Sequence, residues 1–208
     1  YAARRPSGTS IGRIRSASRE FVQKVRLLHL MDRLGIHTAN VGLPGAGPMA
    51  VASVDRLVQE IVNARLKIKA NCAARTVLAD IEPVAKVSQK HGVPVEACLF
   101  IGSSPIRQYA ENWTLEKMLE VSKTAIEYAF KENLPVMYVT EDTTRAHPDT
   151  LRALFRQAVD LGVKRLCLCD TCGHATPWGA RALIRWTKRL LAEWKASDVG
   201  IDWHGHRD

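Results

Sequence analysis

The sequence of 208 residues contains no run of about 18 apolar residues, the length that a membrane-spanning helix needs. Its basic first segment, residues 1–19, also lacks the apolar stretch of a secretory signal, although its Arg- and Ser-rich composition fits a transit peptide. The five cysteines are odd in number, and their spacing does not suggest a secreted disulfide framework. These absences predict a cytoplasmic protein with reduced thiols and no membrane partner.

The net charge of +9 is compatible with binding to nucleic acid or to small anions. However, the sequence has no motif of interleaved aromatic and basic residues that would read nucleic acid, so we expect no nucleic-acid partner. The densest basic patch is at helical spacing, and a solvated helix face is its simplest interpretation. It consists of Arg181, Arg185, Lys188 and Arg189.

Short runs rich in Val, Ile and Leu alternate with amphipathic helical patterns about every 30 residues. The patterns predict helices over 19–35, 52–66, 80–92, 114–133, 148–162 and 178–197, with Thr114 as an N-cap. They predict strands over 37–44, 67–74, 94–101, 135–140, 164–170 and 199–206, and loops at 102–108 and 171–177. Regular alternation of apolar strands with helices indicates a parallel sheet covered by helices.

Such a sheet is either open and doubly wound or closed into a (β/α)8 barrel. No GxGxxG motif follows the first strand, which weakens the dinucleotide-binding version of the open sheet. Polar residues gather at the C-terminal ends of several strands, and in a barrel all these ends face one mouth. They are Asn40, Asn71 and Arg75, Ser103 and Ser104, Glu141 and Asp142, Asp170 and Thr171, and His204 and His206. We therefore expect an incomplete TIM (β/α)8 barrel with about six parallel strands over residues 20–208, preceded by a flexible basic segment over 1–19.

The most C-terminal of these polar groups is the pair His204 and His206. Side chains alternate along a strand, so residues two apart point the same way. A His-x-His strand therefore directs two imidazoles at one point, as a bidentate metal clamp requires. A hydrogen-bonded structural pair is the alternative. A metal site would need a third ligand from elsewhere, for which a carboxylate is the expected type.

A second group lies in the segment TEDTTR, where Glu141 and Asp142 leave a predicted strand. One of the two acids can face the cavity as a general acid or base while the other is fixed by Arg145. The alternative role is capping of the next helix, for which Asp149 is the better placed residue.

Two further motifs have structural interpretations. Cys167, Cys169 and Cys172 have a spacing compatible with zinc, but the first two lie in an apolar strand and are better read as small core residues. They share the face of Thr171 if that residue points into the cavity. The segment GLPGAGP, residues 42–48, lacks the Lys-Ser/Thr of a P-loop and is expected to form a rigid loop at the barrel mouth.

Six motifs follow one another along the sequence: VGLPGAGP, NCAAR, FIGSSPIRQ, VTEDTTR, CDTCGHATP and HGHRD. In this order and spacing they resemble the acyl-CoA condensing enzymes of the 2-isopropylmalate synthase and homocitrate synthase type. Those enzymes belong to the DRE-TIM metallolyases, a superfamily that also includes hydroxymethylglutaryl-CoA lyase. The most specific part of the resemblance is DTxGxATP, followed about thirty residues later by HxH.

The resemblance implies a TIM barrel with one divalent metal ion at its mouth, for which Mg, Mn, Zn and Co all suit the ligands. It implies a Claisen-type condensation of acetyl-CoA or another acyl-CoA with an α-keto acid, and it implies a homodimer. By the same resemblance, the metal ligands are His204 and His206, the catalytic residues are Glu141 and Thr171, and the substrate-binding residues are Arg75, Ser103, Ser104 and Thr171.

The sequence departs from the family at two places. The Asp-Arg-Glu segment of the first strand, with its metal-binding Asp and its enolate-stabilising Arg, is not present, and the eighth strand is not found. We therefore expect a chain without the first and eighth barrel strands and a weakened metal site. A lyase or aldolase that runs the reverse C–C cleavage stays open as an alternative, and so does an inactive barrel fragment or binding module.

Overall fold

The computed structural model describes residues 10–206, and its first helix, α1, spans Ser10–Arg33. The predicted basic segment therefore lies partly outside the described residues, and its residues 10–19 lie in the first part of α1. Six strands follow: β1 (Thr38–Asn40), β2 (Lys69–Arg75), β3 (Glu96–Gly102), β4 (Val136–Glu141), β5 (Arg165–Asp170) and β6 (Gly200–Gly205). Between them lie α2 (Pro48–Asn63), α3 (Leu78–His91), α4 (Pro105–Glu111), α5 (Leu115–Lys131), α6 (Pro148–Asp160) and α7 (Pro177–Glu193), with the 3-10 helices η1 (Pro44–Ala46) and η2 (Thr143–Arg145).

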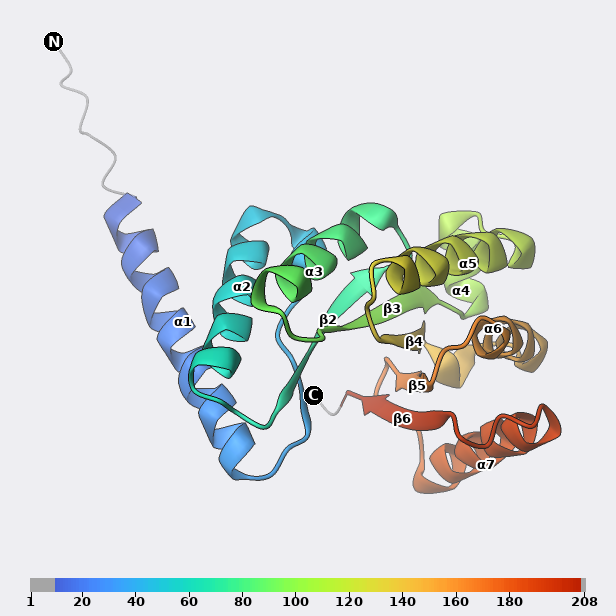
Figure 1. Cartoon of the computed structure of the whole chain (residues 1–208). Helices are drawn as coiled ribbons and strands as arrows, with labels where there is room; N and C mark the ends of the chain where they lie inside the picture. Colours follow the sequence, from blue (N-terminus) through green and yellow to red (C-terminus); the bar gives the residue numbers. More distant parts are fainter. Residues whose placement is uncertain (1–9, 207–208) are drawn as a thin grey trace, which may run out of the picture.

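The six strands form one parallel sheet in the order β1 to β6, with each strand hydrogen-bonded to the next in sequence. The helices cover its outer side, so the sheet forms a half-barrel (Figure 1). The predicted incomplete TIM barrel is thereby confirmed. Because the strands are parallel, their carboxyl ends and the loops that follow them lie at one edge, which we call the mouth.

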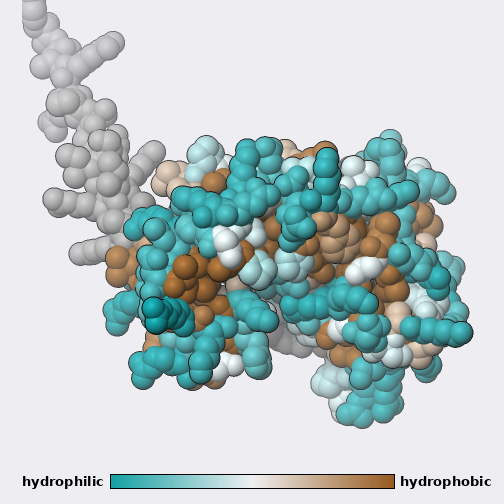
Figure 2. All heavy atoms as spheres, viewed as in Figure 1, coloured by the Kyte–Doolittle hydropathy of each residue, from teal (hydrophilic) through white to brown (hydrophobic). Residues whose placement is uncertain are grey.

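The two sides of the sheet have different cores, as the period of two along each strand requires. Alternate strand residues such as Ala97, Leu99, Tyr138 and Leu166 pack outwards against the helices in the main core. The residues between them form a small inner cluster of Cys98, Met137, Cys167 and Cys169, with Val139 against it. The outer surface of the helices is mainly hydrophilic, with hydrophobic patches between them (Figure 2). No helix within residues 10–206 is long and apolar enough to cross a membrane.

Two local expectations were wrong. Residues 105–111 form α4 instead of a loop, because Pro105 stands at its start and the Ser104 hydroxyl accepts from the Arg107 amide. The first strand is short and ends before the Gly/Pro loop, as expected, and Pro44 begins a 3-10 helix in that loop.

The second concerns the start of α6. There His147 is the N-cap, and its Nδ1 accepts from the backbone N–H of Asp149, the residue expected to be the cap. The predicted N-cap of α5, Thr114, is confirmed by its acceptance of the Lys117 amide.

Candidate active site at the mouth of the half-barrel

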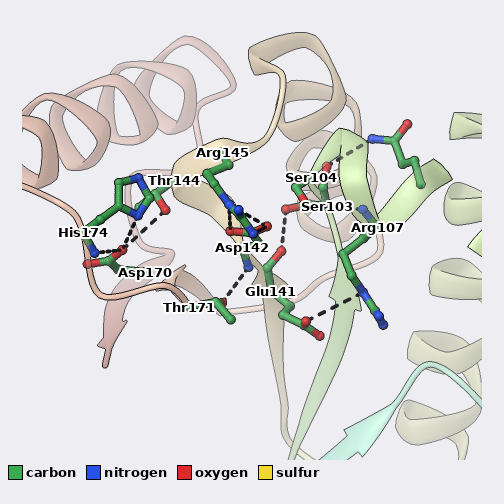
Figure 3. A network of polar contacts seen from close by, with 11 residues as sticks. Ser103, Ser104, Arg107, Glu141, Asp142, Thr144, Arg145, Asp170, Thr171 and His174 are labelled. Atoms are coloured by element: carbon green, nitrogen blue, oxygen red, sulfur yellow. Dashed lines mark hydrogen bonds and ion pairs between the residues drawn. The ribbon is translucent and has the colours of Figure 1, made fainter. Parts of the chain in front are cut away.

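Most of the predicted site residues at the mouth come from the ends of β3, β4, β5 and β6 and from the loops that follow them (Figure 3 shows the first three). At the end of β4, Asp142 adopts a left-handed backbone conformation with φ of 62°, which Asp tolerates better than most residues. Its buried carboxylate accepts 2.8 and 2.6 Å hydrogen bonds from Nε and a terminal nitrogen of Arg145. Asp142 is therefore the acid that Arg145 fixes, which is one of the two arrangements predicted for TEDTTR.

Burial by itself would raise the pKa of Asp142 above its ordinary value of 3.8. Hydrogen bonds from Arg145 and Ser104 outweigh that effect, so the pKa of this carboxyl is lowered. Asp142 is thus a permanent carboxylate with its partners inside the protein, and not a group that exchanges protons near neutral pH.

The neighbouring Glu141 is in a different situation, since its side chain is 30% exposed and lies 3.7 Å from Arg107. Its backbone is firmly held, because the carbonyl oxygen accepts from the amide and from the hydroxyl of Ser103 at 2.9 and 2.8 Å. A rigid backbone with a half-exposed carboxylate is the arrangement that a general acid or base needs. Of the two acids in the motif, Glu141 is the one available for chemistry.

The serines predicted to bind substrate are both fully buried. The Ser103 hydroxyl donates to the Glu141 carbonyl oxygen, and the Ser104 hydroxyl accepts from the Arg107 amide at the start of α4. Ser104 also contributes to the lowered pKa of Asp142. Both hydroxyls are therefore engaged with protein groups. Direct contact of these hydroxyls with substrate stays a prediction.

Thr171 follows β5, and its hydroxyl accepts a 2.8 Å hydrogen bond from the backbone N–H of Asp142 (Figure 3). The β4 and β5 ends are joined a second time by Thr143, whose buried hydroxyl accepts from the Cys169 amide at 2.8 Å. The accepting role of the Thr171 oxygen leaves its O–H group to donate, for example to a carboxylate oxygen. The predicted substrate contact of Thr171 is compatible with this geometry and is untested by it.

The loop after β5 is held by Asp170, which is fully buried. Its carboxylate accepts from the backbone amides of His174 and Ala175 at 3.1 and 3.0 Å (Figure 3 shows the His174 contacts). A charged acceptor satisfies these otherwise unpaired amides strongly. The Asp of DTxGxATP is therefore the residue that shapes this loop.

The Gly of the same motif allows the loop to approach β6. Gly173 has φ of +65°, and a Cβ added there would lie 2.6 Å from the carbonyl oxygen of His206. The His206 amide also donates to the Asp170 carbonyl at 3.3 Å. The two motifs that carry the resemblance, DTxGxATP and HxH, are thus packed against each other.

His204 and His206 are both exposed, and their Nε2 atoms are 3.1 Å apart. The predicted convergence of the two imidazoles is confirmed. Two ligand nitrogens at about 2.0–2.1 Å from one ion are separated by about 2.8–3.4 Å at angles of about 90–109°, so the 3.1 Å separation fits two positions on a metal ion. A hydrogen bond between one protonated and one unprotonated nitrogen fits the same distance. Among residues 10–206 no group of three His, Cys, Asp or Glu side chains is placed to hold a metal. Metal binding by the pair stays a prediction.

Arg75, at the end of β2, makes 2.7 and 2.8 Å hydrogen bonds to the buried carboxylate of Asp80. Gly45, in the segment GLPGAGP, lies directly against that carboxylate, where a Cβ would not fit. The segment is therefore packed on the Arg75–Asp80 pair. Arg75 remains largely exposed, so its outer surface can still meet an anion.

The zinc interpretation of the three clustered cysteines finds no support in the described residues. Cys167 and Cys169 are buried in the inner cluster, whereas Cys172 is exposed on the loop. The reading of the first two as small core residues is confirmed.

Arg107 is the mouth residue that the sequence reasoning missed. It lies on α4, a segment expected to be a loop, and its side chain folds over Gly102 towards Glu141 (Figure 3). The available signal was a glycine, Gly102, with an arginine five residues later. The sequence alone does not show that the Arg107 side chain lies over Gly102, because that depends on the turn between the two residues.

Comparison with known proteins agrees with this geometry. The family model described as HMGL-like matches residues 14–208. The chain is 25% identical over 193 residues to 2-isopropylmalate synthase of Sediminispirochaeta smaragdinae. The aligned region covers 92% of this chain and 37% of that protein. It is 30% identical over 187 residues to homocitrate synthase AksA of Methanothermobacter thermautotrophicus, which covers 89% of this chain and 44% of that protein. The chain therefore spans less than half the length of these curated relatives.

Among solved structures, hydroxymethylglutaryl-CoA lyase from Pseudomonas aeruginosa superposes with a TM-score of 0.66 at 19% identity, over 89% of this chain and 69% of the lyase. The Bacillus subtilis HMG-CoA lyase superposes with a TM-score of 0.61 at 16% identity, over 89% of this chain and 61% of the lyase. At these identities the likeness shows a shared fold. Since the family model covers nearly the whole sequence, the chain belongs to the HMGL-like family, within the DRE-TIM metallolyases that its motifs resemble.

Proposed function

We propose that this chain carries the metal-binding and substrate-binding part of an acyl-CoA:α-keto acid condensing enzyme of the 2-isopropylmalate or homocitrate synthase kind. The observation that carries the proposal is the convergence of two exposed imidazoles, 3.1 Å apart, beside the loop of the DTxGxATP motif. The named activities of the relatives support the reaction class. We further infer a cytoplasmic homodimer with small-molecule substrates.

In this proposal His204 and His206 hold the divalent ion. The remaining ligands are groups other than the His, Cys, Asp and Glu side chains of residues 10–206. When bound, such an ion supplies Lewis-acid polarisation of a substrate carbonyl. Glu141 moves a proton to or from the reacting molecule, since its carboxylate is half-exposed on a fixed backbone.

The remaining residues bind or position. Thr171 donates its hydroxyl proton to a substrate oxygen while it accepts from the Asp142 amide. Arg75 offers an exposed cation at the rim for anionic groups of the substrate. Ser103 fixes the backbone of Glu141 by donating to its carbonyl oxygen, and Ser104 helps to keep Asp142 ionised.

A lyase or aldolase of the same superfamily is the second candidate, favoured by the fold of the two HMG-CoA lyases. Assays of condensation and of cleavage on the same preparation separate the two. An inactive barrel or binding module is the third candidate, because residues 10–206 contain no complete set of three metal ligands.

The test is replacement of each histidine in the full-length protein. His204→Ala and His206→Ala should each weaken Mn²⁺ or Co²⁺ binding by more than about 100-fold, since even outer-shell changes cost about 10–100-fold. His37→Ala is the matched control, because His37 is exposed and precedes β1 at the opposite end of the sheet. Isothermal titration calorimetry measures the affinity, and turnover is followed with acetyl-CoA and a panel of α-keto acids. Metal binding and turnover retained in either mouth variant would rule out the assignment.

A further inference from the structure

Arg107 reaches the mouth because the strand beneath it has no side chain. Gly102 is the last residue of β3 and pairs in register with Glu141 of β4. A Cβ at Gly102 would lie 2.8 Å from the Arg107 Nε and 2.9 Å from the Arg107 Cβ. The Arg side chain therefore occupies the space that any other residue at position 102 would fill, directly beside Glu141.

The electrostatic contact of Arg107 is incomplete. Its Nε is 3.7 Å from Oε1 of Glu141, beyond hydrogen-bonding distance, and a terminal nitrogen is 3.3 Å from Glu111. The Nε is buried and has no hydrogen-bond acceptor. A buried N–H donor without an acceptor is unfavourable. If the Arg107 Nε moved closer to Glu141 by roughly 0.8–1.0 Å, it would come within the range of a charge-assisted hydrogen bond and gain an acceptor.

We propose that Arg107 is a positioning residue for Glu141. Its Nε–H group donates to Oε1 when substrate fills the mouth, and it holds the carboxylate with Oε2 towards the reacting molecule. Catalytic hydrogen bonds are often long in ligand-free sites and tighten in the complex, which is the change that the 3.7 Å separation allows. The proposal rests on the proposed acid–base role of Glu141.

A purely structural role explains these contacts less well. No residue of α4 is buried, and the Arg107 side chain is 39% exposed, so the helix has little packing to lose. The backbone of Glu141 is already held by Ser103. What Arg107 adds is a contact with the end of the Glu141 side chain, the part that does the chemistry.

Two independent changes test the proposal in the full-length, metal-loaded protein. Arg107→Met removes the donor. Gly102→Ala keeps Arg107 in the sequence but displaces its side chain from β3, because the added Cβ at position 102 and the Arg107 Nε cannot occupy the same space. Both should lower kcat on the order of 10–100-fold, as an error of about 1 Å in placement can do. Both should leave KM for the keto acid and the Mn²⁺ affinity within about threefold, and Arg107→Lys should recover part of kcat.

Arg152→Met is the control, since Arg152 is a similarly exposed helix residue whose Glu193 partner lies on α7. An unchanged kcat in Arg107→Met removes this inference and leaves the proposed function intact. A rise in KM with kcat unchanged would assign Arg107 to substrate binding, and a loss of metal affinity or folding would assign it to structure, so either result also overturns the proposal. No turnover in the unaltered protein removes the proposed function and this inference with it.

Discussion

The two sides of the mouth are held in place by different means. On the β4 and β5 side, Asp142 and Asp170 are buried, and their carboxylates accept hydrogen bonds from Arg145 and from the backbone amide of His174. On the β6 side, His204 lies on β6 and His206 directly follows it, and both side chains are exposed. Among the described strands, β6 pairs with β5 alone. The β4 and β5 side is therefore the rigid side of the mouth, with its acids fixed by hydrogen bonds inside the protein, whereas the two imidazoles are open to solvent. We expect the buried acids to set the shape of the mouth and the exposed histidines to be available for a ligand.

The largest effect should follow from Asp170→Asn, which breaks the rigid side. An amide has one acceptor oxygen, and its NH2 group would face one of the two amides that the carboxylate now satisfies. We expect a loss of about 2–3 kcal/mol in the free energy of unfolding, measured by urea denaturation. Asp198→Asn, at an exposed pair with Lys164, should cost far less, because solvent screens that pair. Equal losses in the two variants would contradict the role given to Asp170.

Gly173→Ala tests the contact between the two sides. Its φ of +65° and the close His206 carbonyl should together cost about 2 kcal/mol and displace the histidine pair. We therefore expect both lower stability and roughly tenfold weaker Mn²⁺ binding by calorimetry.

Gly162→Ala separates the two causes, because Gly162 has φ of +98° but nothing within 4 Å of an added Cβ. It should lose stability and keep its metal affinity. The same affinity in both variants would show that the loop does not position the histidines.

Asp142→Asn should lower the free energy of unfolding by a smaller amount, about 1–2 kcal/mol, because its partner Arg145 is partly exposed to solvent. The lowered pKa of Asp142 determines how this loss of stability depends on pH. The stabilisation is fully present above the unfolded value near 3.8 and is lost as the pH falls through the folded pKa.

The measurement is the difference in unfolding free energy between Asp142→Asn and the unaltered protein, from pH 7 to pH 3. The difference should be constant above about pH 5 and shrink below pH 4. Asp160→Asn, in an exposed pair with Arg156, is the control. A difference that grows on acidification would refute the assigned charge state.

Much of this site follows from periodicity, which is why it could be predicted. The period of two placed His204 and His206 on one side of a strand and separated the inner Cys167 and Cys169 from the outer Leu166 and Leu168. The alternation of apolar runs with helical patterns about every 30 residues predicted six parallel strands with their polar ends at one edge. These patterns are local, so they survive without knowledge of tertiary contacts.

What could not be predicted depends on contacts between segments. The residues of TEDTTR left open which of the two acids Arg145 would hold, and the left-handed turn brings Asp142 into its reach. The roles of Ser103 and Ser104 required knowledge of which strand lies next to β3. The start of α4 was different, since Ser104 followed by Pro105 is a local start signal that the sequence reasoning passed over.

The distribution of the cysteines gives this protein a built-in reporter position. Cys72, Cys98, Cys167 and Cys169 are buried, and burial raises the pKa of Cys72 to about 12 and that of Cys98 further, so these two thiols are poor nucleophiles at neutral pH. Cys172 alone of the five is exposed, and it adjoins the glycine that contacts the end of β6. A thiol-reactive fluorophore or spin label should therefore attach selectively beside the histidine pair, so that occupancy of the mouth can be followed spectroscopically in the unmutated chain.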